Sequence, residues 1–272
     1  MISIFKRISV AACLAMSLAL FAGSAVAQDS PVLDRVVKNG QLRVGMSGSQ
    51  PPFNVVSRNG SLIGLEVDLA TLLAAGLRVD LKIVQKPFGD LLGELSAGNV
   101  DVVMSGMAIT PQRAQSVSFA GPYMMAGKSI LTRSDALASA KSAGDVNSAD
   151  ITLAALENST SQQFAEKVMP QSKLVKVKDY DEAVKMLLDG KVDALVADMP
   201  ICVLTILRNP NAGLSTLAQP FTVEPIGIAM SANDPQMLNL VESYVEAMEK
   251  MGALDQLRKK WLQDSSWIAA LP

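Results

Sequence analysis

The 272-residue chain contains no histidine and only two cysteines, Cys13 and Cys202. Without histidine, every catalytic site that pairs Ser or Cys with His is excluded, and so are the usual His-based zinc sites. We expect Cys13 to be removed with an N-terminal signal, which leaves Cys202 without a partner for an intramolecular disulfide. Cys202 stands in the apolar run ICVL and is predicted to be a buried small hydrophobe. We predict no metal site, no cofactor and no catalytic residue.

After its first 27 residues the chain also lacks any apolar run long enough to cross a membrane. The first 27 have the three parts of a secretory signal: the basic residues Lys6 and Arg7, an apolar stretch at 8–22, and the small-residue site AVA before Gln28. A lipoprotein acylation site at Cys13 is the alternative, but almost no apolar segment precedes it. We predict a cleaved signal peptide at 1–27 and a periplasmic mature protein.

Basic patches with interleaved aromatic residues are absent as well. Removal of Lys6 and Arg7 leaves 22 basic residues against 26 acidic ones, a net charge of −4 for the mature chain. A mildly acidic protein repels a phosphate backbone, so we predict no binding to nucleic acid.

Short apolar runs alternate with amphipathic stretches, which is the pattern of βα units around a parallel sheet. In the first set we expect strands at 42–46, 79–84 and 100–104 and helices at 65–77 and 88–97. A loop rich in Gly, Ser and Pro is expected through residue 52. In the second set we expect strands at 151–156, 174–177 and 192–197 and helices around 164–168 and 183–188. Two further helices are predicted at 235–251 and 254–262.

Extended segments at 124–131 and 219–230 separate the two sets. The chain is therefore predicted to cross twice between two lobes. Lobe 1 is expected to comprise residues 28–125 with residues 222–272 returning to it, and lobe 2 to comprise residues 126–221.

Arg113 lies where ordinary helix energetics disfavours a cation. Thr110 and Pro111 are typical of an N-cap and a first helical residue, which predicts a helix with Arg113 in its first turn. This turn follows the expected strand at 100–104. A guanidinium and free backbone N–H groups at the carboxyl end of a strand suit an anion, best a planar carboxylate. The alternative is a solvated surface arginine.

Two features of the second lobe also follow predicted strands, where doubly wound sheets bind ligands. Ser159 and Thr160 offer hydroxyls and amides at a helix start, and Asp198 offers a negative charge. Together with Arg113 they outline a receptor for a zwitterion. Taken singly, Ser159, Thr160 and Asp198 have a second interpretation as helix caps.

Several segments resemble the amino-acid-binding class of solute-binding proteins of ABC importers. They are PPF at 51–53, GLEVDLATLL from 64, SGMAITPQR from 105, SFAGPY from 118, the turn at 158–161 and VDALVADMP from 192. The resemblance implies the two-lobed type II periplasmic binding protein fold, with a doubly wound, mostly parallel sheet in each lobe and a two-strand hinge.

Carried over by position, the resemblance implies a role for each of several residues. Arg113 would grip a ligand α-carboxylate with help from the amides of Ser159 and Thr160, and Asp198 would bind the α-ammonium. The backbone at Gly106 would touch the α-groups. Phe88 would line the side-chain pocket. Phe53 and Phe88 each have two interpretations, as a residue that packs on the ligand or as a core residue.

Three positions depart from the family pattern. Ala108 stands where the family usually has a hydroxyl, and Gln50 stands where an aromatic residue is common. Ser47 replaces a frequent acid. The α-group contacts are therefore fewer, and a basic ligand side chain has no evident partner.

The leading hypothesis is a periplasmic receptor that binds an amino acid or related small carboxylate and delivers it to an ABC permease as a monomer. One alternative is an enzyme of the same fold, similar to cyclohexadienyl dehydratases. Dehydratase-like members of the family resemble a pattern with a glutamate just after the Ser/Thr turn. This chain has Gln162 at that position, and a glutamine side chain cannot act as a general acid. The other alternative is a sensor component that presents its ligand to a membrane receptor.

Overall fold

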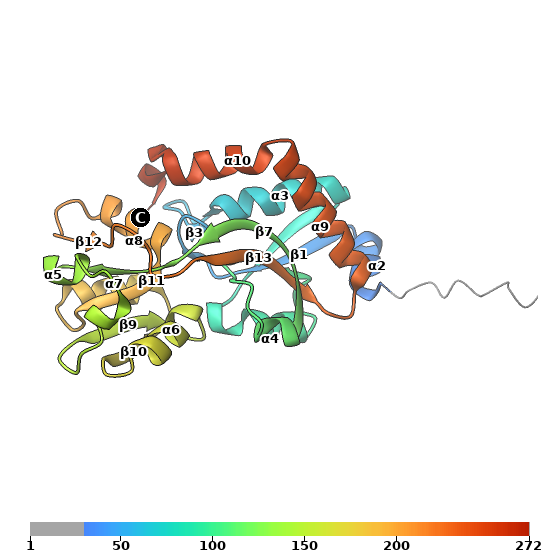
Figure 1. Cartoon of the computed structure of the whole chain (residues 1–272). Coiled ribbons are helices and arrows are strands. Elements are labelled where there is room, and N and C mark those ends of the chain that lie inside the picture. Colours follow the sequence, from blue (N-terminus) through green and yellow to red (C-terminus); the bar gives the residue numbers. More distant parts are fainter. Residues whose placement is uncertain (1–29, 272) are drawn as a thin grey trace, which may run out of the picture.

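The computed structural model describes residues 30–271, so the predicted signal peptide at 1–27 and the expected start at Gln28 lie outside the described residues. The chain forms two α/β lobes that lie side by side in Figure 1. Strands β7 (Val117–Ala126) and β13 (Glu224–Ser231) belong to the sheet of one lobe and extend from it toward the other lobe. In residues 30–271, no helix has the length and apolar character that a membrane span requires.

Lobe 1 is built on a five-stranded sheet in the order β5-β1-β6-β13-β7. Strands β1 (Gln41–Met46), β5 (Asp80–Gln85) and β6 (Val102–Val103) are parallel to one another, and β13 is antiparallel to β6 and β7. The helical elements of this lobe are α2 (Pro31–Asn39), α3 (Leu65–Leu77), η1 (Phe88–Asp90), α4 (Leu91–Ser96), η2 (Arg113–Gln115), α9 (Pro235–Lys250), α10 (Ala253–Arg258), a π-helical turn η4 (Lys259–Gln263) and η5 (Ser266–Ala270).

Helix α3 shows how the sequence pattern produces this lobe. Its buried residues include Leu65, Leu69 and Leu73, which are spaced by four along one face. Side chains at this spacing lie above one another on a helix, so α3 covers the sheet with a continuous apolar stripe. Its observed range matches the helix predicted at 65–77.

The segment predicted to be a loop through residue 52 instead begins a small antiparallel sheet. Its strands are β2 (Ser49–Gln50), β3 (Asn54–Val56) and β4 (Leu62–Ile63), in the order β2-β3-β4. These strands have two or three residues each, too few to show a period of two in the sequence. The small sheet carries Gln50, and Phe53 follows between β2 and β3.

Lobe 2 is built on a second five-stranded sheet in the order β10-β9-β11-β8-β12. Strands β9 (Thr152–Leu156), β10 (Lys173–Val177) and β11 (Ala194–Asp198) are parallel, and β8 (Lys128–Thr132) is antiparallel to β11 and to β12 (Ser215–Thr216). The helical elements of this lobe are α5 (Asp135–Ala138), η3 (Ala143–Asp145), α6 (Thr160–Val168), α7 (Tyr180–Leu188) and α8 (Met199–Arg208).

The lobes are joined where the two crossing segments run antiparallel. The Phe221 amide donates to the Lys128 carbonyl over 2.7 Å, and the Lys128 amide donates to Thr222 Oγ1 over 2.9 Å. Gly127 lies between β7 and β8, and a Cβ there would overlap the Thr222 carbonyl. The Gly127 carbonyl accepts from the Met199 amide at the start of α8. The crossing is therefore a tightly packed backbone junction, and Lys128 is at its centre.

A buried acid, Glu66 on α3, ties lobe 1 together. Its side chain accepts hydrogen bonds from the Gly106 amide (2.6 Å), from Asn54 Nδ2 (2.5 Å) and from the Tyr123 hydroxyl. These donors belong to the turn after β6, to β3 and to β7. Burial raises the pKa of Glu66 to about 7, although the three hydrogen bonds act in the opposite direction.

This carboxyl predicts a pH dependence of stability. The native state holds the proton of Glu66 more tightly than the unfolded chain does, so its contribution is full below pH 4.5 and is lost as the pH rises through 7. The shift corresponds to about 3 kcal/mol in the free energy of unfolding. The Glu66→Gln variant has no titrating group at this position. Its free energy of unfolding is therefore expected not to fall in this way with rising pH, as measured by urea unfolding between pH 4.5 and 7.5.

Glu242→Gln, which changes an exposed acid of α9, is the matched control and should keep the wild-type decline. The same pH dependence in wild type and Glu66→Gln would show that Glu66 does not titrate in this range.

Candidate functional site

The predicted site residues come from both lobes and lie at the carboxyl ends of parallel strands. The turn that leads to Arg113 follows β6, Ser159 and Thr160 follow β9, and Asp198 is the last residue of β11. The lobes meet here: Arg113 Nη2 donates to the Asn158 carbonyl over 3.3 Å. In a doubly wound sheet this is the edge where ligands bind.

The helix predicted to begin at Thr110 is wrong, because η2 is a single 3₁₀ turn. Thr110 does cap it, since its Oγ1 accepts from the Arg113 amide over 3.2 Å. The Ile109 amide, just before the turn, already donates to the Pro225 carbonyl of β13, and β7 starts at Val117. Sheet pairing on both sides leaves room for one turn, so no helix dipole acts on Arg113.

Arg113 is nevertheless no solvated surface arginine. Its side chain is buried (8% exposed), and its guanidinium donates to the carbonyls of Ala108 (2.9 Å) and Asn158. The guanidinium carbon lies 5.8 Å from the centre of the Phe88 ring, within range of a cation–π interaction. Burial lowers the pKa of Arg113 to about 10, and the charges of Glu224 and Asp198 partly offset this. At neutral pH the group is a buried cation.

Asp198 is buried (5% exposed) and its side chain makes no capping hydrogen bond to α8. Asp198 thus occupies the N-cap position of α8, as its second interpretation predicted, but its side chain does not cap the helix. Its Oδ1 instead accepts a charged hydrogen bond of 2.6 Å from Lys128 Nζ, and the Lys128 side chain is only 1% exposed. The carboxylate that the family resemblance assigns to a ligand ammonium is thus already paired within the protein.

The same lysine binds a second carboxylate. Lys128 Nζ lies 3.0 Å from Glu224 Oε2, which also accepts from Thr160 Oγ1 over 2.8 Å. Glu224 Oε1 accepts from Thr222 over 3.3 Å. Lys128 and Glu224 come from the two crossing segments and Thr160 from α6 of lobe 2. The result is a cluster at the junction of the lobes in which a buried ammonium is paired with one buried carboxylate, Asp198, and one partly buried carboxylate, Glu224.

Ser159 serves as the N-cap of α6, as one of its two interpretations predicted. Its hydroxyl accepts from the Gln162 amide over 3.1 Å and donates to the Leu156 carbonyl over 2.6 Å. Thr160 is the first residue of α6, and its hydroxyl is directed to Glu224. Both side chains are therefore engaged within the protein.

Gly106 and Ala108 shape the turn after β6. Gly106 has a positive φ of 61°, which favours glycine, and a Cβ there would lie 2.5 Å from Gln50 Oε1 and displace that side chain. Its amide is bound by Glu66. Ala108 contributes its carbonyl, which holds Arg113.

Gln50 and the two phenylalanines line lobe 1 around this turn. Gln50 is buried, and its Nε2 has no hydrogen-bond partner among the described residues. Phe53 is fully buried, with its ring edge 3.4 Å from the position of a Gly106 Cβ. Phe88 is 5% exposed and lies against Arg113.

Sequence reasoning missed Lys128 and Glu224. Both stand in segments that were predicted to be extended and largely apolar, and a charged residue in such a segment is a signal for a buried ion pair. Asn158 was also missed as a contact of Arg113. Its role depends on its backbone carbonyl at a positive φ of 58°, for which the side chain gives no direct signal.

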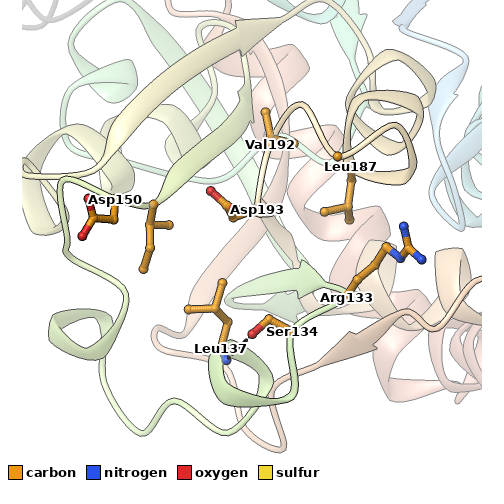
Figure 2. Close-up of a pocket in the computed structure, with 9 residues that line it drawn as sticks. Arg133, Ser134, Leu137, Asp150, Leu187, Val192 and Asp193 are labelled. Carbon is orange, nitrogen blue, oxygen red and sulfur yellow. Dashed lines mark hydrogen bonds between the residues drawn. The ribbon is translucent and has the colours of Figure 1, made fainter.

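A cavity of about 520 Å³ lies elsewhere, on lobe 2. Figure 2 shows Arg133 on one side of it and Asp150 on the other, with Leu137 and Ser134 between. Asp193 and Ile151 place it at the amino ends of β11 and β9. It is therefore at the opposite edge of the sheet from Asp198. In residues 30–271 no three His, Cys, Asp or Glu side chains are grouped as metal ligands would be.

The buried cluster predicts a large stability difference between two lysines. Lys128→Met leaves Asp198 and Glu224 without their counterion and is expected to cost about 3–5 kcal/mol. Lys86→Met removes a more exposed pair with Glu94 and should cost about 0–1 kcal/mol. Urea unfolding at pH 7 measures both, and equally small losses would contradict the buried pairing.

Known proteins share this architecture over most of the chain. The L-cystine-binding protein TcyJ of Escherichia coli K12 is 27% identical over 251 residues, which cover 90% of this chain and 92% of that protein. Cyclohexadienyl dehydratase of Pseudomonas aeruginosa is 26% identical over 252 residues, which cover 93% of this chain and 92% of that enzyme.

Among solved structures, the ancestral amino acid-binding protein AncCDT-1, a precursor of cyclohexadienyl dehydratase, matches with a TM-score of 0.79 and 35% identity. The match covers 86% of this chain and 100% of that one. These likenesses agree with a type II periplasmic binding protein fold. The sequence also matches one protein family over residues 42–264. The chain therefore belongs to the bacterial extracellular solute-binding proteins, family 3.

Proposed function

We propose that this protein is a periplasmic receptor for a small carboxylate, which it binds between its lobes and delivers to an ABC permease as an exported monomer. Most of the relatives found are named as amino-acid-binding proteins, which supports binding and not catalysis as its role. The predicted export signal supports the periplasmic location.

The state of Arg113 is the observation that carries the proposal. Its guanidinium is buried at the contact between the lobes, yet among residues 30–271 it makes no ion pair with a carboxylate. Its two hydrogen bonds go to neutral carbonyls, one from each lobe. A desolvated cation whose hydrogen bonds go only to neutral carbonyls favours an anion, and a carboxylate fits the planar fork of the guanidinium.

The structure also supports ligand binding coupled to closure of the lobes. Arg113 belongs to lobe 1 and Asn158 to lobe 2, and a Cβ on Gly89 of lobe 1 would lie 2.7 Å from Asn158 Nδ2. A carboxylate on Arg113 would thus contact groups of both lobes. Such a ligand stabilises the closed arrangement by its greater affinity for it.

The enzymatic alternative has one relative in its favour, the cyclohexadienyl dehydratase. Gln162, at the position of the family glutamate, is engaged at the start of α6. Its Oε1 accepts from the Asn158 amide over 2.8 Å and its Nε2 donates to Glu166 over 2.9 Å. A side-chain amide held in this way supplies no proton, so we propose that the chain binds without chemistry. Incubation with cyclohexadienyl carboxylates and analysis for products tests this.

Loss of Arg113 is expected to abolish binding. A thermal-shift screen of amino acids and small carboxylates first identifies ligands, since a ligand at about 100 times its Kd stabilises a protein by about 2.7 kcal/mol. For a ligand found in this way, Arg113→Ala should weaken binding by about 2–5 kcal/mol in calorimetry, because it removes one side of a buried charge pair.

Arg133→Ala is the matched control. Arg133 is also a cation that follows a strand, but it lines the separate cavity of Figure 2. Its loss should leave affinity unchanged. Loss of binding in Arg133→Ala with full binding in Arg113→Ala would place the ligand in that cavity and refute the proposed site.

A further inference from the structure

The hydrogen-bond balance of the site bears on the chemical class of its ligand. Both carboxylates at the lobe junction are already paired with a cation of the protein. Asp198 Oδ1 accepts from Lys128, and Glu224 accepts from Lys128, Thr160 and Thr222. A ligand ammonium needs acceptors of this kind, and here a lysine of the protein already binds them.

The hydrogen-bond donors of the site, in contrast, lack charged acceptors within the protein. Arg113 donates only to neutral carbonyls. Gln50 Nε2 is a buried amide donor that has no partner among residues 30–271. Gln50 lies against Gly106, two residues from Ala108, whose carbonyl holds Arg113. A buried donor without an acceptor is costly, so it favours a ligand that supplies one.

Electrostatic repulsion also disfavours a ligand that carries an ammonium group. An α-ammonium placed on Asp198 would lie close to the Lys128 ammonium, which is 2.6 Å from the same carboxylate and is shielded from water. Two like charges in a buried site repel more strongly than they do in water. Lys128 thus stands where the family resemblance expects the amine of the ligand.

We propose that the ligand is a small carboxylate without an α-ammonium and with a further oxygen acceptor, the class of 2-oxo and 2-hydroxy acids. This inference rests on the proposed function, because it assumes that Arg113 binds the ligand carboxylate. Lys128 replaces the ligand amine as the counterion of Asp198 and Glu224, and Gln50 supplies a donor for the additional oxygen.

Calorimetry with matched compounds tests this class directly. The probes keep the side chain constant and change only the α-group: pyruvate, lactate and alanine; phenylpyruvate, phenyllactate and phenylalanine; 4-methyl-2-oxopentanoate and leucine; 2-oxoglutarate and glutamate. For each side chain that binds, the oxo or hydroxy acid is expected to bind at least about tenfold more tightly than the amino acid. Lys128→Met leaves Asp198 and Glu224 free for a ligand ammonium and should reverse the preference.

A double variant, Lys128→Met with Asp198→Asn, tests the role of Lys128 even if Lys128→Met alone fails to fold. It removes one charge of each sign, so it should unfold less readily than Lys128→Met, and it should gain less affinity for the amino acid than Lys128→Met does, because only Glu224 remains for the ammonium. Circular dichroism checks the fold of each variant.

The possible failures are distinguishable. An amino acid that binds wild type as tightly as its oxo acid, with the binding lost in Arg113→Ala, overturns this inference and leaves the proposed function intact. Binding of no carboxylate, or binding that does not depend on Arg113, overturns the proposed function and this inference with it.

Discussion

The buried ammonium of Lys128 is the interaction on which the organisation of the site depends. It lies at the crossing of the two inter-lobe segments, where its backbone is bonded to residues 221 and 222 and its side chain to Asp198 and Glu224. Each carboxylate would be costly to bury alone. One lysine thus compensates a buried acid, Asp198, and a partly buried one, Glu224, at the junction between the lobes.

Lobe 1 also contains a buried acid, but this acid is stabilised by hydrogen bonds and not by a cation. Glu66 collects donors from the turn after β6, from β3 and from β7, and so fixes the turn that presents Arg113. Its three donors do not cancel the cost of burial, which keeps its pKa high. Site residues are therefore positioned by two different means, an ion-pair cluster at the junction of the lobes and a hydrogen-bonded carboxyl in lobe 1.

The sequence predicted the regular elements of the fold because these are governed by periodicity. Helix α3 lies where its apolar spacing placed it, and strands β1, β9 and β11 lie within two residues of the predicted ranges. The strands β2 to β4 are too short to show a period, and the helix expected after Thr110 is cut short by sheet pairing that no local pattern reveals.

The site was predicted less completely, and the reason is physical. Strand ends and cap residues are local signals, so the sequence brought Arg113, Thr160 and Asp198 into consideration. The partners of these residues are set by contacts across long stretches of chain. Lys128 and Asp198 are separated by 70 residues, and Thr160 and Glu224 by 64. A charged residue in an apolar segment can indicate a buried ion pair, but a single sequence does not show which distant residue is its partner, here Asp198 for Lys128.

The arrangement also explains how a receptor of this family can keep its fold while its ligand changes. Arg113 lies on lobe 1, separate from the Lys128 cluster, and depends on the Ala108 and Asn158 carbonyls for its position. The proposed grip of Arg113 on a carboxylate does not therefore depend on the group that meets the other end of the ligand. In this proposal Lys128, held at the junction by backbone bonds, supplies the charge that a ligand amine would otherwise bring. The proposed ligand class then depends on one residue of the crossing segment, without any change in the sheets that carry the site.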